Sequence, residues 1–316
     1  MQLDVIIPTY NRQKLLERTL QSLRVARVPE GLTVKVTVVD NNSSDDTRAL
    51  VERWKASFPD RLSYVFEPKQ GRSHALNAGI DSSDGDLLGF IDDDEEIEET
   101  WYETVHSAFS NPDVDFIGGP YLPRWEINPP SWLPPDYCGV IGAMNAGDLI
   151  TPYGEEFPGM LMGGNAVLRR AIVHRVGKYL TTVGRSGNKL LAGEDDDMYR
   201  RLLEANAKGV YHPNLKIFHY IPAQRLTKRY FRRWCFWRGV SLGVLDRNKP
   251  KDVAYLLGVP RYLYGQAARG ALRNLVARLK STNNSAELFA GELAVWDIMG
   301  FFYGKHLYRV DRALDA

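Results

Sequence analysis

Apolar residues in the first part of the chain fall into short runs separated by amphipathic stretches. Three β-rich runs each precede a stretch with helical spacing: 3–8 before 13–26, 34–40 before 46–57, and 62–66 before 73–80. Such alternation predicts βαβ units around a parallel sheet. A fourth run, 86–91, is almost continuously apolar, which is typical of a central strand covered on both faces. The pattern therefore predicts an α/β fold.

The pattern changes after this predicted sheet. A helical stretch at 99–110 and a short strand at 114–118 lead into an irregular run of Pro, Trp and Gly at 120–158. Loops this long in compact domains are usually functional or mobile. Periodicity then resumes: helical stretches at 166–176 and 194–205, a strand at 216–219, and from residue 225 two or three helices broken near Pro250 and Pro260. We therefore expect a sheet domain followed by a helical region.

Charge is divided unevenly along the chain, although the formal net charge is only +1. Residues 1–215 hold 22 Lys and Arg against 32 Asp and Glu, whereas residues 216–280 hold 15 against 2. An acidic front half suits a bound cation. A basic back half suits phosphate or an anionic membrane, with a solvated helical face as the simpler alternative.

Nothing in the sequence indicates export or membrane insertion. The first apolar run, 3–8, is too short for a secretory signal, and no stretch approaches the about 18 uninterrupted apolar residues of a membrane span. Cys138 and Cys235 have no partner at metal-ligand or redox-motif spacing. These features predict a reduced, cytoplasmic chain in which each thiol packs in the interior.

Acidic residues fall where two of the predicted strands end. Asp40 ends the second strand, and the triplet 92–94 follows the fourth. Because ligands of open α/β sheets bind outside the carboxyl ends of the strands, both groups should lie along one edge. Three successive carboxylates at the end of a buried strand repel one another, so a hard divalent cation is the simplest counter-charge. A solvated acidic turn is the alternative.

A cation at this edge implies a ligand that carries phosphate, because magnesium-like ions commonly bridge carboxylates and phosphates. The turn after the first strand, 8–12, reads PTYNR and contains neither of the Gly-rich phosphate-binding loops. This excludes a dinucleotide-binding dehydrogenase and a P-loop kinase. The metal would therefore neutralise most of the diphosphate charge.

A series of motifs resembles those of family-2 glycosyltransferases with the GT-A fold. They are PTYNR at 8–12, VVDNNSSD at 38–45, GRS at 71–73 with NAG at 77–79, DDD at 92–94, GGN at 163–165 and GED at 193–195. The resemblance covers about residues 3–240. It implies a mostly parallel, twisted sheet flanked by helices. The catalytic domain would be 1–224, with a nucleotide-binding half at 1–118 and an acceptor half at 119–224, followed by a helical region at 225–316.

The resemblance also implies a donor site along the acidic edge. The residues expected to bind the nucleotide sugar are Pro8, Thr9, Tyr10, Arg12, Asp40, Asn42, Gly71, Arg72, Asn77, Asp92 and Asp93. Asp40 would accept a hydrogen bond from the base, and Arg72 would approach the base or the diphosphate. Core packing is the alternative for Tyr10, and a charge at a helix start is the alternative for Arg12.

The metal ligands implied by the resemblance are Asp94 and His219. Asp94 is the last residue of the acidic triplet, and His219 ends a short predicted strand. A lone histidine is more often structural than a ligand, so a structural role stays open for His219. The cofactor expected at this pair is Mn²⁺ or Mg²⁺.

A second acidic run, 194–197, precedes a predicted helix. Inverting transfer needs one carboxylate to remove the acceptor's proton as the hydroxyl oxygen attacks the anomeric carbon. The resemblance gives this role to Asp195, with Asp196 as the alternative, although acidic residues in a first helical turn are also ordinary dipole partners. The residues expected on the acceptor side are Gly164, Asn165, Glu194 and Trp132. For the loop that contains Trp132, a lid without sugar contact is the alternative.

Basic and aromatic residues alternate at 225–238. Such interleaving can stack on nucleic acid, but no nucleic-acid motif accompanies it and the front half is acidic. It also suits a helix lying on anionic lipid, so we expect peripheral membrane contact through 225–280 and no nucleic-acid partner. A helix packed on the catalytic core with its arginines in water is the alternative.

Together these features predict an inverting glycosyltransferase that uses a nucleotide-diphosphate sugar, with UDP as the expected nucleotide. From the resemblance, the acceptor would be a lipid-linked glycan in bacterial surface-polysaccharide synthesis, at the inner face of the cytoplasmic membrane. The alternatives are a nucleotidyltransferase, whose usual basic Gly-rich loop is missing, and a non-catalytic sugar-nucleotide-binding scaffold, which would be expected to lose its acidic residues. Retaining transfer is a lesser variant.

Overall fold

The computed structural model describes residues 1–181, 193–246, 253–279 and 285–308. The chain divides into two compact units. The first comprises Met1–Arg124, Ala143–Thr181 and Glu194–Tyr220, and the second comprises Trp125–Gly142, Thr182–Gly193 and Ile221–Ala316. The domain boundary expected at residue 225 stays a prediction.

The first unit is built on a mostly parallel sheet, as the sequence predicts. Within the described residues, its eight strands run in the order β3 (Leu62–Phe66), β2 (Thr33–Asp40), β1 (Gln2–Thr9), β4 (Leu87–Phe90), β9 (Ala166–Arg169), β6 (Phe116–Gly118), β10 (Gly209–Tyr211) and β8 (Thr151–Pro152). The first four strands are mutually parallel, whereas β9 is antiparallel to both of its neighbours. The carboxyl ends of β1, β2 and β4 therefore meet along one edge.

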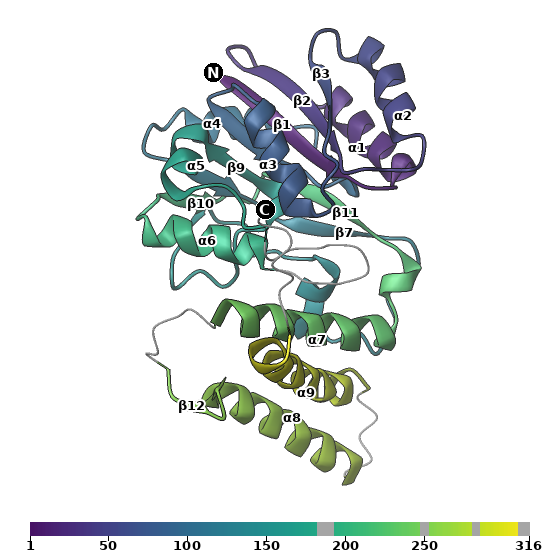
Figure 1. The fold of residues 1–316 in the computed structure, drawn as a ribbon, viewed down its shortest axis with the longest axis vertical. Coiled ribbons are helices and arrows are strands. Elements are labelled where there is room, and N and C mark those ends of the chain that lie inside the picture. The colour runs from purple at the N-terminus through teal and green to yellow at the C-terminus, as the bar shows by residue number, and fades with distance from the viewer. Residues whose placement is uncertain (182–192, 247–252, 280–284, 309–316) are drawn as a thin grey trace. The chain divides into compact units, whose positions relative to one another are not determined.

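Helices cover both faces of this sheet (Figure 1). They are α1 (Gln13–Val25), α2 (Thr47–Trp54), α3 (Arg72–Ser82), α4 (Trp101–Phe109), α5 (Arg170–Val176) and α6 (Glu194–Glu204). Alternate residues of β1 serve the two faces, because successive side chains of a strand point in opposite directions. Ile7 packs in one core with α1, α2 and α4, and Ile6 packs in the other with α3, α5 and α6.

A smaller sheet extends the acidic edge. Its strands are β5 (Glu95–Ile97), β11 (Ile217–Ile221) and β7 (Tyr121–Trp125), with β11 in the middle. β5 begins directly after the acidic triplet and pairs antiparallel with β11, so that Glu95 lies opposite His219. This pairing brings residues from distant parts of the chain to the end of β4.

The prediction of a helix at 166–176 is wrong for the first four residues. Residues Ala166–Arg169 form β9, which lies between β4 and β6, and only Arg170–Val176 is helical. A run of four residues is too short for periodicity to separate a buried strand from a helix. The adjacent sheet positions on β4 and β6 decide the conformation.

The second unit contains three long helices among its described residues. They are α7 (Lys228–Leu245), α8 (Arg261–Leu279) and α9 (Ser285–His306). The hairpin of β12 (Tyr255–Leu256) and β13 (Val259–Pro260) precedes α8, and the unit also contains the short helix η2 (Pro135–Ile141). The break near Pro260 is confirmed, whereas Pro250 lies outside the described residues. α9 lies between α7 and α8 (Figure 1).

Helix α7 contains most of the basic and aromatic run 225–238. Its Phe231 and Cys235 are fully buried. Arg232 Nε donates to Glu292 Oε1 of α9 at 2.6 Å, and Arg238 Nε donates to Asp297 Oδ1 at 2.9 Å. The aromatic face of this helix is therefore packed, and two of its arginines are paired with α9. The membrane contact expected through 225–280 stays a prediction.

Candidate active site

The ends of β1 and β4 hold a buried cluster of carboxylates. Thr9 Oγ1 donates to Asp93 Oδ2 at 2.7 Å, and Arg12 Nη1 donates to Asp93 Oδ1 at 2.8 Å and to Asp94 Oδ2 at 3.0 Å. Asp93 and Asp94 are buried. Burial raises the pKa of Asp93 to about 6, although the charge of Arg12 acts in the opposite direction. The cluster thus holds more negative charge than its surroundings favour, with Arg12 as a counter-charge.

Arg72, the first residue of α3, joins the two acidic motifs. Its Nη2 lies 2.9 Å from Asp92 Oδ1, and its Nη1 lies 3.0 Å from Asp195 Oδ1 and 3.2 Å from Glu194 Oε1. Only 13% of the Arg72 side chain is exposed. The carboxylate cluster expected on the donor side and the one expected on the acceptor side therefore share a single buried guanidinium.

Two glycines allow the second acidic motif to approach the sheet. A Cβ on Gly163 would overlap the carboxylate of Asp195, and a Cβ on Gly164 would overlap Glu95 and the Tyr121 hydroxyl. The structure thus brings together the two glycines that precede β9, the start of α6 and the start of β5.

His219 lies beside Asp94. Its Nε2 is 3.6 Å from Asp94 Oδ2, and the backbone N–H of the next residue, Tyr220, donates to the Asp94 carbonyl at 2.9 Å. Both side chains are buried. Within the described residues no three His, Cys, Asp or Glu side chains converge as a ready metal site. Asp94 and His219 thus form a close buried pair, and their role as metal ligands stays a prediction.

Asp40 lies at the end of β2 and is buried. Its Oδ1 accepts from the Ser43 N–H at 2.8 Å, and its Oδ2 accepts from the Tyr64 hydroxyl at 2.7 Å. Asn42, one turn further on, is exposed and has φ of 67°. Its buried neighbour Asn41 bonds to the backbone of Glu67, Lys69 and Gly71. Asn41 thus shapes the loop that leads to Arg72, a role the sequence analysis missed.

Two predicted site residues use their side chains to hold the fold. Asn165 is fully buried, and its Nδ2 donates to the Leu215 carbonyl at 2.7 Å while its Oδ1 accepts from Trp101 Nε1 at 2.9 Å. Asn77 bonds to both backbone groups of Tyr179. These contacts position the turn before β9 and the middle of α3. Contact of either residue with a substrate stays a prediction.

The other predicted residues differ in exposure. Pro8 is buried at the end of β1, whereas Tyr10 is 46% exposed, so Tyr10 is not core packing. Gly71 caps the start of α3 with φ of 142°. Trp132 belongs to the second unit, where it packs edge-on against Phe231 and Phe289. Its contact with an acceptor stays a prediction.

Glu95 is a site residue that the sequence analysis missed. It is 1% exposed, and its Oε2 accepts from the Asp92 N–H at 2.8 Å. Burial, together with the charges of Asp92 and Asp94, raises the pKa of Glu95 well above its ordinary value. Its place directly after the acidic triplet was the available signal, because strand alternation makes one of two successive glutamates face inward.

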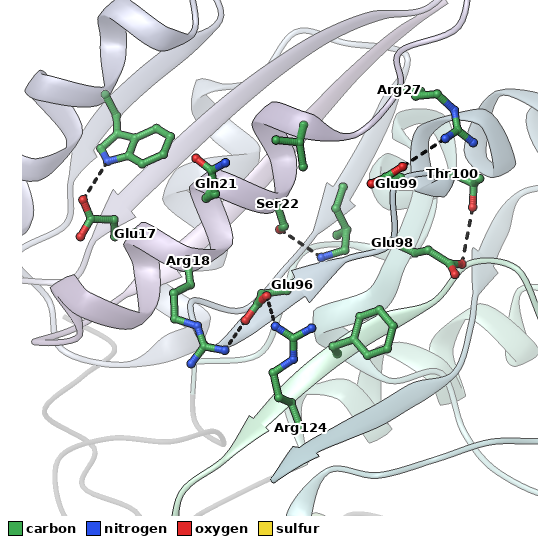
Figure 2. Close-up of a pocket in the computed structure, with 14 residues that line it drawn as sticks. Glu17, Arg18, Gln21, Ser22, Arg27, Glu96, Glu98, Glu99, Thr100 and Arg124 are labelled. Carbon is green, nitrogen blue, oxygen red and sulfur yellow. Dashed lines mark hydrogen bonds and ion pairs between the residues drawn. The ribbon is translucent and has the colours of Figure 1, made fainter. Parts of the chain in front are cut away.

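Glu96 faces the opposite side of β5 and lines a hollow of about 760 Å³ between α1 and the small sheet. Figure 2 shows its carboxylate between the guanidinium groups of Arg18 and Arg124, with which it forms ion pairs. Most of the lining residues are at least partly exposed, and charged members are paired, Arg27 with Glu103 and Glu98 with Lys216. The buried carboxylates on the other side of β5 are therefore the better candidate for an active site.

Comparison with known proteins supports the same reading. The family model described as glycosyl transferase family 2 matches residues 4–177. The succinoglycan biosynthesis protein ExoM of Rhizobium meliloti is 29% identical over 79% of this chain and 76% of its own length. The glucosyl-dolichyl phosphate glucuronosyltransferase of Haloferax volcanii is 26% identical over 79% of each chain.

Among solved structures, the mannosyltransferase PcManGT from Pyrobaculum calidifontis, in complex with GDP-Man and Mn²⁺, aligns with a TM-score of 0.58. It is 20% identical, over 95% of this chain and 84% of that one, so the likeness concerns the fold. The sheet topology, the carboxylates at its edge and the family match over more than half of the chain lead to one conclusion. The chain belongs to glycosyl transferase family 2.

Proposed function

We propose that this glycosyltransferase transfers a sugar, with inversion, from a nucleotide-diphosphate sugar to an acceptor hydroxyl. UDP is the nucleotide we propose. The observation that carries the proposal is the single guanidinium of Arg72, which joins Asp92 to Glu194 and Asp195. In an inverting reaction the base must lie close to the anomeric carbon of the bound donor. A guanidinium shared by the donor-side and acceptor-side carboxylates supports that proximity.

The donor would bind along the edge formed by the ends of β1, β2 and β4. Tyr10 and Asn42 are exposed there and would contact the nucleotide, while the buried Asp40 would hold the loop that receives the base. Arg12 and Arg72 supply positive charge for the diphosphate. Asp92 and Asp93 would contact ribose or sugar hydroxyls, because an ionised carboxylate accepts hydrogen bonds that hydroxyl groups donate.

Asp94 and His219 would hold Mn²⁺ or Mg²⁺. Their separation of 3.6 Å and their buried setting fit two ligands of one ion, whose remaining positions the diphosphate oxygens and water would fill. When bound, the ion would act as a Lewis acid that stabilises the leaving diphosphate. The solved mannosyltransferase, which holds Mn²⁺ with GDP-Man, is consistent with this use of metal in the fold.

Asp195 would act as the general base. Its side chain is 26% exposed, whereas that of Glu194 is 6% exposed, so Asp195 is the more accessible of the pair. Its carboxylate takes the proton of the acceptor hydroxyl as the oxygen forms a bond to the anomeric carbon. The bond to the diphosphate breaks on the opposite face, which inverts the configuration.

The acceptor we propose is a lipid-linked glycan in surface-polysaccharide synthesis, at the inner face of the cytoplasmic membrane. The two relatives support this choice, since one is a succinoglycan biosynthesis protein and the other a glucosyl-dolichyl phosphate glucuronosyltransferase. Glu194 shares the Arg72 guanidinium with Asp195, and Gly164 follows Gly163, which lies against Asp195, so both would border the acceptor. Trp132 is proposed as a further sugar contact.

The test is nucleotide release from UDP-, GDP- and dTDP-sugars in the presence of a lipid-linked acceptor, with Mn²⁺ and with EDTA. Asp195→Asn should lower kcat by about 10²–10⁴ while leaving the donor Kd unchanged, because only the base is lost. Asp196→Asn, one residue away and exposed, is the matched control and should retain activity. The anomeric configuration of the product follows from NMR.

Three outcomes would contradict the proposal or a part of it. Loss of activity in Asp196→Asn but not in Asp195→Asn would move the base to the neighbouring residue. Failure of calorimetry to detect binding of any sugar nucleotide would remove the donor site itself. Donor binding without turnover in the presence of a range of acceptors would favour the non-catalytic scaffold.

A further inference from the structure

Helix α8 of the second unit exposes its apolar residues. Leu272, Leu275 and Val276 are 61%, 56% and 39% exposed. Toward α9 the helix instead presents Gly270, which is buried against Gly291 so closely that a Cβ on either glycine would overlap the other's backbone. Helices of soluble domains usually bury their apolar side, so this helix is arranged the opposite way.

The exposed apolar residues of α8 lie along one stripe. With 100° per residue, Leu275, Leu272 and Val276 span about 100° of the helix surface, and Arg269 and Arg273 follow on one side of it. These two arginines are exposed, as is Arg261 at the start of the helix. α8 contains no Asp or Glu. The outward face therefore combines leucines with positive charge.

The arginines of this face contrast with those of α7. Arg232 and Arg238 of α7 are paired with carboxylates of α9. For Arg261, Arg269 and Arg273, by contrast, the described part of the chain offers no ion-pair partner. These three charges are therefore available to an anionic partner, whereas those of Arg232 and Arg238 are already paired.

The hairpin before α8 adds a second apolar projection. Its tip is Leu257, which is 73% exposed and has a left-handed backbone with φ of 49°, followed by Gly258 with φ of 74°. Such a tight turn favours Asn-Gly or Asp-Gly, and a leucine in this conformation costs about 1–2 kcal/mol. Its neighbour Leu256 is 48% exposed as well.

This tip is held in place. The Tyr264 hydroxyl donates to the Leu256 carbonyl at 3.1 Å, and His306 Nε2 lies 3.1 Å from the Leu257 carbonyl. The exposed leucines thus stand on an ordered hairpin that leads directly into α8.

We propose that the outward face of α8 and the Leu256–Leu257 hairpin tip dock on a bilayer that contains anionic phospholipid. The leucines enter the boundary between head groups and acyl chains, and the arginines bind lipid phosphates. Among the described helices none has the length and apolarity to cross a bilayer, so the helix lies on the surface. The proposal rests on the membrane location proposed above and assigns the contact to one face of α8 and the hairpin tip. It does not depend on which sugar nucleotide the enzyme binds.

The test is co-sedimentation of the full chain with phosphatidylcholine vesicles that contain or lack phosphatidylglycerol. The wild type should bind the anionic vesicles, and salt should weaken the binding. The double variant Leu272→Glu/Leu275→Glu should lower the partition coefficient by roughly a hundredfold, since each buried leucine contributes about tenfold. Arg269→Gln/Arg273→Gln should lower it by about fivefold per arginine.

Two further variants separate docking from folding. Leu257→Asn removes the apolar tip but suits the left-handed turn, so it should weaken vesicle binding without lowering Tm. Leu149→Glu/Ile150→Glu changes two exposed apolar residues of the first unit and should leave vesicle binding unchanged. Calorimetric binding of the UDP-sugar in solution should be equal in all variants, so a failure of the donor site is seen separately.

Several results would overturn the proposal. One is that the wild type does not bind anionic vesicles. Another is that the wild type and the leucine variants bind them with the same partition coefficient. A third is a dimer in sedimentation velocity that the leucine variants dissociate while vesicle binding stays the same. That result would assign the face to a second copy of the chain.

Discussion

Arg12 and Arg72 both neutralise carboxylates of the catalytic unit, but they do so in different settings. The Arg12 side chain is 37% exposed and touches two neighbouring residues of the acidic triplet. The Arg72 side chain is 13% exposed and joins three carboxylates from two motifs. An exposed guanidinium can be exchanged for another cation, whereas a buried one that serves three partners is part of the structure.

The comparison predicts the largest effect for Arg72→Met. Removing the guanidinium leaves Asp92, Glu194 and Asp195 close together without a counter-charge, so the variant should lose about 3–5 kcal/mol of unfolding free energy. Urea denaturation measures this loss. Arg72→Lys keeps the charge but loses the planar guanidinium, so its unfolding free energy should lie between those of the wild type and Arg72→Met. A loss for Arg12→Met as large as that for Arg72→Met would remove the distinction between the two sites.

Gly163→Ala should cause the next largest loss of unfolding free energy. The added methyl would overlap the Asp195 carboxylate, including the Oδ1 atom that pairs with Arg72, and such overpacking typically costs about 1–3 kcal/mol. Because the base is displaced, kcat should fall as well, while the donor Kd stays the same. Gly154→Ala is the control, since nothing lies within 4 Å of its added Cβ. Normal kcat in Gly163→Ala would show that Asp195 tolerates displacement.

Arg12→Met tests the exchange of one cation for another. The guanidinium contacts both Asp93 and Asp94, so its removal should raise the affinity of the site for Mn²⁺ by about tenfold at low salt. Titration calorimetry with the metal alone measures the change. Arg18→Met, which removes a partner of Glu96 on the other side of β5, should leave Mn²⁺ affinity unaltered. Unchanged affinity in Arg12→Met would mean that Arg12 and the ion occupy separate places.

The smallest effect is expected for Glu96→Gln. Glu96 follows Glu95 directly, but its partners Arg18 and Arg124 are 40% and 44% exposed, so the ion pairs contribute less than about 1 kcal/mol. Activity should be normal and thermal unfolding nearly so. Glu95→Gln is the informative counterpart, because its buried carboxylate lies beside Asp92. Equal effects of the two changes would contradict the assignment of opposite faces.

The sequence predicted the positions of the acidic groups better than their surroundings. Asp40 and the triplet 92–94 follow apolar strands, and parallel pairing of β1, β2 and β4 does bring these strand ends together. The counter-charge was expected to be a metal alone. That Arg12 and Arg72 reach the carboxylates depends on how the loops and α3 fold across the edge, which local patterns do not encode.

The antiparallel β9 and the small sheet show the same limit. Ala166–Arg169 is a strand because β4 and β6 flank it, and Glu95 is a site residue because β11 pairs with β5. Both facts arise from contacts between segments far apart in the chain. His219 was correctly placed near Asp94 only through the resemblance, since a lone histidine has no spacing signal of its own.

The three partners of Arg72 also have an order in time. Asp92 lies 20 residues from Arg72 along the chain, whereas Glu194 and Asp195 lie 122 and 123 residues away. At a synthesis rate of about 5–20 residues per second, the second pair leaves the ribosome roughly 5–25 s after Arg72. A nascent chain can therefore form the Arg72–Asp92 pair first, and the start of α6 then joins a guanidinium that is already oriented.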